Sequence, residues 1–213
     1  MQIAGLRLPD DMIDALRSAY AAPPRAYHHF GHVGDVLVHH GEVASGPGWA
    51  QPLETALAVL YHDAVSVAGA RDNEARSAVL ARQHIAHWLP QGAADTGRVA
   101  ELIELTARHG QFAPGDFGAG GIADDTRHFL DCDMAILGAP SEVFDRYDRA
   151  IAEEYRGVVP AWLYRRKRRA FLRSLLERER IFLSDFFHAR LDGVARANLA
   201  RAVARKPADE ARD

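Results

Sequence analysis

The spacing of apolar residues is the feature that most restricts how this chain can fold. Apolar side chains recur three and four positions apart along most of the sequence, and the alternation typical of strands is rare. We therefore expect an all-α protein, a bundle of about eight to ten helices and no strands. The predicted helices span residues 10–20, 28–41, 51–65, 73–88, 96–109, 125–137, 141–156, 160–179 and 184–205, the last broken near Gly193.

The length of the chain favours one domain. With 213 residues, 48% of them hydrophobic, the chain is long enough to bury a substantial core. We expect a single helical domain over residues 1–213, with the core motifs at about 25–138 and the helices at 141–205 packing on them. Asp72 can cap the helix that follows it, and Glu74 then lies in the first turn, where negative charge is favourable.

Charge and cysteine content exclude several classes of protein. The net charge of -3 at pH 7 does not favour general attraction to nucleic acid or to an anionic membrane. No run of about 18 apolar residues predicts a membrane span, and the N-terminal residues lack the pattern of a signal peptide. The single cysteine, Cys132, fits a reducing compartment, so we expect the cytoplasm. The oligomeric state stays open, with a homodimer among the alternatives.

One basic run requires its own interpretation. Residues 164–173 contain Arg165, Arg166, Lys167, Arg168, Arg169 and Arg173. On a helix these charges spread around more than half of the circumference, while Leu163 and Phe171 keep an apolar side. Acidic residues follow nearby, so a solvated helix face is favoured over a nucleic-acid patch.

Periodicity places one aspartate on an apolar face. When the helix at 125–137 is wound at about 100° per residue, Asp133 falls within an apolar stripe and Asp131 falls on the other side, near Arg127. The stripe consists of Phe129, Leu130, Ile136 and Leu137. A buried carboxylate must be protonated, paired with a cation or bound to a metal. A structural aspartate that caps a loop is the alternative.

Histidines near helix ends are the other candidates. His62 and Asp63 end a helix that is apolar nearly all round, but for the pair alone a histidine interacting with the helix dipole is the favoured interpretation. Among the histidines at positions 28, 29, 32 and 40, periodicity does not choose. His109 closes another helix, where a dipole interaction is again the simplest interpretation.

Taken together, these pieces form the order H…HD…D on a helical chain, which resembles the HD superfamily of metal-dependent phosphohydrolases. RAYHHFGH at 25–32 resembles the R-x-Y-H-x-x-x-H segment of one bacterial branch of predicted HD phosphohydrolases. LYHDAV at 60–65, RDNEARSA at 71–78 and FLDCDMAILG at 129–138 resemble that branch's Y-H-D-A-V, D-N-E-x-x-S-A and D-x-D-x-x-I-L-G segments. ARANLARAV at 195–203 is also similar, so the resemblance covers most of the chain in order.

The resemblance implies an HD-domain-like fold and a set of metal ligands. Those ligands would be His32, His62, Asp63 and Asp133. Four nitrogen and oxygen donors suit a divalent transition metal such as Mn, Fe, Co, Ni or Zn. The sequence has Ser66 where the branch usually has Tyr, and Cys132 where it usually has Ala; neither change removes a ligand.

The resemblance also implies a phosphohydrolase. Its substrate would be a phosphate ester, a nucleotide or a small phosphorylated metabolite, cleaved by metal-activated water. Asp63 would be both ligand and proton acceptor, and Glu74 an acid, a base, a support for the metal shell or simply a helix-terminal charge. The candidate substrate contacts are Arg25, His28, Arg76 and His109. Exposure to solvent is the alternative for the arginines, and His109 is also a candidate for a second metal.

Two other functions stay open. Some HD-fold proteins are di-iron oxygenases, whose sites need more histidines between the HD pair and the last aspartate. His84, His87 and His109 lie in that interval, but only His109 has a suitable position at a helix end. A non-catalytic protein that binds or senses a nucleotide is the third alternative. The identity of the substrate, and the identity and number of metals, are not readable from the sequence.

Overall fold

The computed structural model describes residues 1–21 and 25–205, and helices dominate them. This confirms the predicted all-α class. The nine α-helices of the described residues are α1 (Asp10–Ala21), α2 (Phe30–Ser45), α3 (Pro52–Tyr61), α4 (Asn73–Trp88), α5 (Thr96–Leu105), α6 (Gly121–Met134), α7 (Ser141–Glu154), α8 (Ala161–Leu176) and α9 (Asp185–Ala204). Three short 3-10 helices are η1 (Thr106–Arg108), η2 (Pro114–Phe117) and η3 (Ala135–Gly138).

A small hairpin near the N-terminus corrects the expectation that the chain has no strands. The strands β1 (Gln2–Ile3) and β2 (Leu6–Arg7) pair antiparallel. Ala4 and Gly5 connect them with φ values of 44° and 82°. Two successive residues with positive φ form the kind of tight turn whose twist suits a hairpin. The strands are too short for alternation to reveal them.

The prediction of a break near Gly193 is wrong, because α9 is continuous over 20 residues. A glycine costs a helix only about 1 kcal/mol. Burial of Phe187, Ala195 and Leu199 along the same helix offsets that cost. Neither α9 nor any other helix in the described ranges is long and apolar enough to cross a membrane.

Most helix ends lie within a few residues of the predicted bounds, and capping explains the differences. His29 precedes α2, and its side chain accepts a hydrogen bond from the backbone N–H of Gly31, so α2 begins later than expected. Asp72 is the N-cap residue of α4 but makes no side-chain capping bond. The segment predicted to be helical to residue 109 tightens after α5 into η1.

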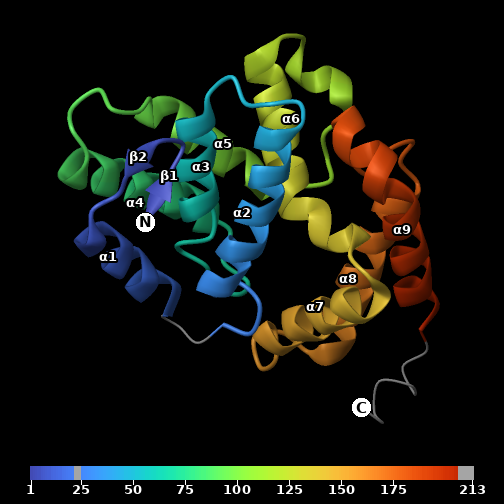
Figure 1. Ribbon diagram of the computed structural model, residues 1–213. Helices are drawn as coiled ribbons and strands as arrows, with labels where there is room; N and C mark the ends of the chain where they lie inside the picture. Colours follow the sequence, from blue (N-terminus) through green and yellow to red (C-terminus); the bar gives the residue numbers. More distant parts are fainter. Residues whose placement is uncertain (22–24, 206–213) are drawn as a thin grey trace.

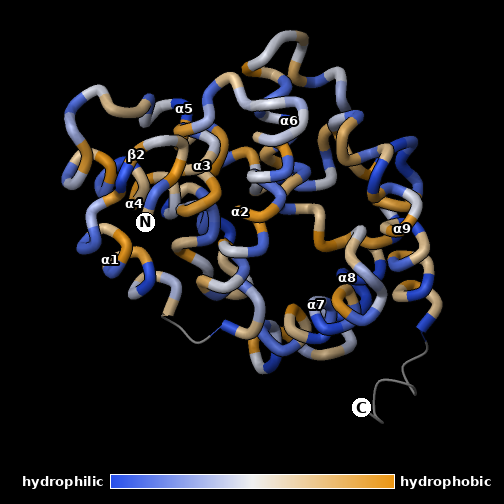
Figure 2. The backbone as a smooth tube through the Cα atoms, viewed as in Figure 1, coloured by the Kyte–Doolittle hydropathy of each residue, from blue (hydrophilic) through white to orange (hydrophobic). Residues whose placement is uncertain are grey.

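The helix α3 lies at the centre of the fold. Its residues from Thr55 to Tyr61 are buried, and it contacts α2, α4, α5 and α6. Figure 1 shows α2, α3 and α6 in the middle of the molecule, with α1 and α4 on one side and α7, α8 and α9 on the other. In Figure 2, hydrophobic and hydrophilic positions alternate along peripheral helices such as α1 and α9, as expected for helices with one buried face.

The basic run lies on α8, which is only partly buried. Leu172 and Leu175 form its buried side. Arg168 donates from Nε to Asp148 Oδ1 at 3.0 Å, whereas Arg165 and Arg166 are exposed. A solvated face with a local ion pair describes this helix.

Candidate metal centre

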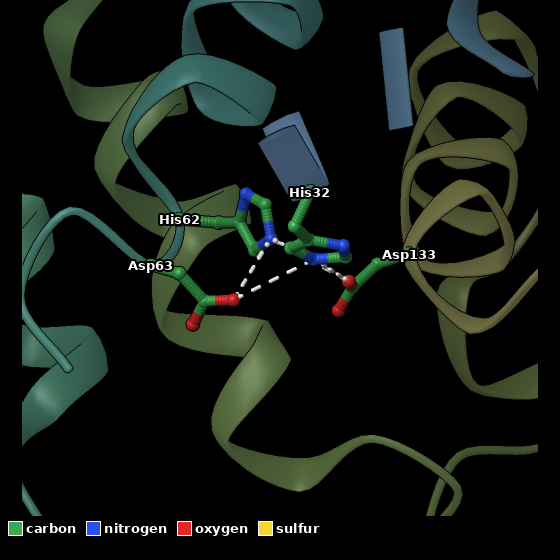
Figure 3. Close-up of side chains that lie close together, drawn as sticks. All are labelled: His32, His62, Asp63 and Asp133. Atoms are coloured by element: carbon green, nitrogen blue, oxygen red, sulfur yellow. Dashed lines mark hydrogen bonds and ion pairs between the residues drawn. The ribbon is translucent and has the colours of Figure 1, made fainter. Parts of the chain in front are cut away.

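Four side chains from three parts of the chain point toward one another in Figure 3. His32 comes from the first turn of α2, His62 and Asp63 directly follow α3, and Asp133 lies near the end of α6. One ligand atom from each side chain lies within 4.8 Å of the other three, so the group could hold a metal ion. We call these four residues the His/Asp cluster.

The spacing of the donor atoms in the His/Asp cluster matches a single cation. His32 Nε2 lies 3.1 Å from His62 Nε2, 3.0 Å from Asp133 Oδ1 and 3.7 Å from Asp63 Oδ2. His62 Nε2 lies 3.1 Å from Asp63 Oδ2 and 3.4 Å from Asp133 Oδ1. Bonds of about 2.1 Å to a common centre put donors about 3.0 Å apart at right angles and about 3.4 Å apart at tetrahedral angles. The residues present therefore fit a metal ion.

The backbone fixes the ring of His62. Its Nδ1 donates a hydrogen bond to the carbonyl oxygen of Val59 at 2.8 Å. Because a carbonyl only accepts, Nδ1 carries a proton, and the neutral ring keeps its lone pair on Nε2, the atom that faces the cluster. Histidines that bind metals are commonly held by such a bond from the other nitrogen.

The charges of the cluster depend strongly on one another. Burial lowers the pKa of His62, but Asp63 and Asp133 outweigh burial and raise it well above the ordinary value. Burial raises the pKa of Asp133, but His109 and His62 lower it well below its usual range. A proton on His62 therefore balances the carboxylates when no metal is bound. A metal would take over that balancing charge.

The cluster has a closed back and an accessible front. The side chains of His32 and His62 are 2% and 1% exposed, whereas those of Asp63 and Asp133 are 19% and 13% exposed. The carboxylates are thus the part of the cluster that solvent reaches.

His28 stands beside Asp63 and is held by a residue that the sequence did not predict. Its Nδ1 lies 2.6 Å from Glu154 Oε2, at the end of α7, and its Nε2 lies 4.0 Å from Asp63 Oδ2. Glu154 Oε1 also accepts hydrogen bonds from the backbone N–H groups of Tyr27 and His28. Burial lowers the pKa of His28, but Asp63 and Glu154 raise it above the ordinary value. The ring is therefore a candidate cation at the front of the cluster.

His109 stands beside the other carboxylate. Its Nδ1 lies 3.1 Å from Asp133 Oδ2, and its Nε2 is a buried atom without a partner among the described residues. Burial lowers the pKa of His109, so the ring is neutral near pH 7. The charge of Glu74 acts on this ring, but none of the described hydrogen bonds joins Glu74 to the cluster.

The two arginines predicted as substrate contacts lie in different settings. The Arg25 guanidinium donates to the carbonyl oxygens of His28 at 3.0 Å, Asp63 at 2.6 Å and Ala64 at 3.0 Å. It therefore ties the segment before α2 to the end of α3. Arg76 is exposed on α4. Contact of either arginine with a substrate stays a prediction.

The prediction that Asp131 lies outside the core is wrong. It is 1% exposed and accepts hydrogen bonds from Leu183 N at 2.7 Å, Ser184 N at 2.7 Å and Ser184 Oγ at 2.6 Å. Burial raises the pKa of Asp131 to about 7, although these hydrogen bonds lower it. Asp131 therefore has a structural role, because it binds the backbone N–H groups just before α9. Cys132, between the two aspartates, is buried, and burial raises the pKa of its thiol.

His40 and His84 have local partners away from the cluster. His40 stacks on Trp49 with ring centres 4.5 Å apart and lies 3.0 Å from Thr55 Oγ1. His84 Nδ1 lies 3.1 Å from the hydroxyl of Tyr61, and His87 is exposed. Neither His84 nor His87 joins the His/Asp cluster. Of His84, His87 and His109, the three histidines considered for an oxygenase site, only His109 lies beside the cluster.

Comparisons with models of known protein families, with curated proteins and with solved structures found no match to this chain. The described residues themselves show a His/Asp cluster of the right dimensions for a metal ion. His28 and His109 flank its two carboxylates.

Proposed function

We propose that this protein is a metal-dependent phosphohydrolase of the HD superfamily, which cleaves a phosphate ester of a nucleotide or of a small phosphorylated metabolite. The observation that supports it is the convergence of His32, His62, Asp63 and Asp133, in the chain order H…HD…D, on one metal-sized space. A bound Mn, Fe, Co, Ni or Zn ion would polarise a phosphoryl oxygen and lower the pKa of a water.

The residues of the cluster divide this work. His32 and His62 form the closed back, and the bond from His62 to Val59 keeps the required lone pair in place. Asp63 directs Oδ2 toward the histidines. Its Oδ1 is then a candidate to accept a proton from the attacking water.

His28 supplies positive charge where a phosphoryl group would enter. The Glu154 carboxylate fixes Nδ1, so Nε2 is the atom that faces the front of the cluster. Its 4.0 Å separation from Asp63 Oδ2 is too long for a hydrogen bond, which leaves Nε2 able to donate to a substrate oxygen. This role would raise affinity for an anion.

His109 offers the opposite chemistry on the other flank. A proton on Nδ1, which lies 3.1 Å from Asp133 Oδ2, would leave the neutral ring a lone pair at the unpartnered Nε2. It can accept a hydrogen bond from a substrate hydroxyl. Glu74, which lies near enough to influence His109, stays a candidate acid or base.

A metal-reconstituted assay tests the proposal. The chain is loaded in turn with Mn, Fe, Co, Ni and Zn and offered a panel of nucleotides and phosphate monoesters, and released phosphate is measured. At least one combination should turn over. Asp63→Ala should lose more than about 100-fold of the rate, because replacing even the outer partners of metal ligands costs about 10–100-fold. The matched control Asp35→Ala, at an exposed position of α2, should keep the rate.

Each other result favours a stated alternative. Equal turnover by wild type and Asp63→Ala would refute the site. Tight nucleotide binding without turnover for every metal would favour a sensing protein. Consumption of oxygen by the iron-loaded chain would favour the oxygenase.

A further inference from the structure

The segment that joins α8 to α9 is hydrogen-bonded to the chain on both sides of one contact in the metal centre. We call residues 177–184 the α8–α9 connector. The contact is between His109 and Asp133, whose Nδ1 and Oδ2 atoms lie 3.1 Å apart. Neither residue belongs to the connector, but the connector binds close neighbours of each. It is therefore placed to set how the two side chains meet.

Arg178 of the connector holds the loop that follows His109. Its Nη1 donates to the carbonyl oxygen of Gly110 at 2.7 Å, and its Nη2 donates to the carbonyl oxygen of Phe112. The rigid fork of a guanidinium suits two acceptors that lie close together. The loop also lies directly against α8, because a Cβ at Gly110 would stand 2.5 Å from Leu175 Cδ2. The backbone next to His109 is thus fixed by Arg178 and by packing.

The connector also holds the helix that carries Asp133. The backbone N–H groups of Leu183 and Ser184 each donate to the carboxylate of Asp131 at 2.7 Å. Asp131 precedes Asp133 by two residues on α6, so these bonds fix the last turn of that helix. The backbone on both sides of the contact between His109 and Asp133 is therefore attached to one segment.

The helix α9 anchors the connector in turn. Arg196 Nη2 donates to the carbonyl oxygens of Arg178 at 2.9 Å and Glu179 at 2.8 Å. Asp192 accepts a hydrogen bond from the backbone N–H of Ile181 at 2.8 Å and pairs with Arg196 Nε at 2.6 Å. Arg178 is thus supported by side chains of a long helix, which holds a position more precisely than a loop does.

Little free space separates the connector from the metal centre. The cavity among these elements has a volume of about 10 Å³ and is lined by His109, Asp131, Ile181 and Leu183, among others. That volume is about the space for one water molecule. Because close-packed groups transmit displacements, a shift of the connector or of the loop would move the ring of His109.

We infer that Arg178 is a positioning residue that acts through His109, an inference that rests on the proposed function, in which His109 contacts the substrate. The ring of His109 has no hydrogen-bond partner for Nε2 among the described residues. Its orientation therefore depends on the contact of Nδ1 with Asp133 and on the backbone that Arg178 holds. Loss of the two hydrogen bonds from Arg178 frees that backbone and lets the ring turn away from the substrate.

A second arginine in the same loop provides a matched control. Arg127 Nε donates to the carbonyl oxygen of Pro114 at 3.0 Å, and its Nη2 donates to the carbonyl oxygen of Gly118. Like Arg178, it fixes the loop through two carbonyl oxygens, but these lie further from His109 along the chain. Arg127 therefore represents an arginine that only stabilises the loop.

NMR of the full chain, treated with EDTA, tests the inference without turnover. The Cε1–H signal of His109 is identified by its absence from His109→Gln. Arg178→Met removes both donors while keeping a long side chain, and it should shift this signal. Arg127→Met should leave the signal in place. Arg178→Lys, which keeps a cationic donor, should return the signal part of the way to its wild-type position. Thermal melts establish that each variant is folded.

Turnover by the metal-loaded chain gives a second readout. Arg178→Met should lower kcat at least about tenfold, because a small displacement of a group that contacts the substrate is costly. In the His109→Gln background the same substitution should cost less than about twofold, because the residue through which Arg178 acts is gone. Arg127→Met should cost less than about twofold in either background, since its bonds lie further along the loop.

Three results would overturn the inference: an unchanged His109 signal in folded Arg178→Met, equal changes of that signal in Arg178→Met and Arg127→Met, or a full loss of kcat from Arg178→Met when His109 is already replaced. If Arg178→Met does not fold, Arg178→Lys compared with Arg127→Lys answers the same question. Absence of turnover by wild type would refute the proposed phosphohydrolase, and the NMR comparison would still decide whether Arg178 positions His109.

Discussion

Asp131 and Asp133 lie two residues apart on α6 and serve two different regions. At the junction with α9, Asp131 accepts hydrogen bonds from two backbone N–H groups and from a serine hydroxyl. In the His/Asp cluster, Asp133 faces imidazoles of His32, His62 and His109. A backbone N–H can only donate a hydrogen bond, whereas an imidazole can lose its proton and offer a lone pair to a metal or a donor. The difference separates a carboxylate that holds the fold from one that can take part in chemistry.

The two regions also differ in access. Asp131 is 1% exposed, and the side chain of Asp133 is 13% exposed. Each donor to Asp131 is permanent and shielded, so its hydrogen bonds need no ligand. Among the partners of Asp133, His109 has an Nε2 atom without a hydrogen-bond partner in the described residues.

The sharpest way to break this comparison is the same substitution at both positions. Asp133→Asn should bind a divalent metal more than about 100-fold more weakly, because it removes a ligand charge where even outer partners are worth about 10–100-fold. Asp131→Asn, its matched control, should keep the metal affinity of wild type. Competition with a chelating dye measures both. Equal losses would show that the two aspartates are not functionally distinct.

The reverse pattern is expected for stability. Asp131→Asn turns one acceptor oxygen into an NH₂ group that faces N–H and O–H donors, so the free energy of unfolding should fall by about 2–4 kcal/mol. Urea unfolding of metal-free protein measures this change. Asp133→Asn should cost less, because it relieves a buried charge that needs a protonated histidine. A larger loss at Asp133 would contradict the assignment.

The dependence of metal binding on pH sharpens the comparison further. The pKa of His62 is raised in the folded protein, so its proton stabilises the metal-free fold at low pH, and this stabilisation is lost as pH rises through the folded pKa. Metal binding requires the deprotonated ring. Affinity should therefore increase about tenfold per pH unit below that pKa and level off above it. Calorimetry in buffers of different ionisation enthalpy counts the released proton; no release would exclude His62 as a ligand.

The smallest expected effect concerns Glu154. Glu154→Gln keeps an acceptor for the backbone but weakens the charged contact with His28, so turnover should fall by about fivefold, near 1 kcal/mol. Because burial raises the pKa of Glu154 while His28 lowers it to about 2, the wild-type contact should persist until strongly acidic pH. Glu153→Gln is the adjacent control, half-exposed and paired with Arg156. Equal turnover by the two variants would show that Glu154 does not contribute to the site.

The sequence revealed the helices and the H…HD…D order but misassigned Asp131. Periodicity identifies a buried face only when a helix has one, and α6 buries residues on several sides, among them His128, Phe129, Leu130, Asp131 and Cys132. Because α6 has no single buried stripe, the position of Asp131 around the helix axis did not predict whether it is buried.

Other parts of the site depend on contacts that local patterns cannot show. Glu154 lies 126 residues from His28 along the chain, and an acidic residue at a helix end gives no local signal of that contact. Likewise, the motif selected His32, but only the structure shows that His29 caps α2 and that His40 packs on Trp49.

The position of Cys132 has a practical consequence. As the only cysteine of the chain, buried between Asp131 and Asp133, it can react with an alkylating reagent only when α6 opens. The rate of alkylation therefore measures how often α6 unfolds locally, and the measurement needs no introduced label. A ligand bound by Asp133 should lower the rate of alkylation of Cys132. Weakening the hydrogen bonds between Asp131 and the start of α9 should raise that rate.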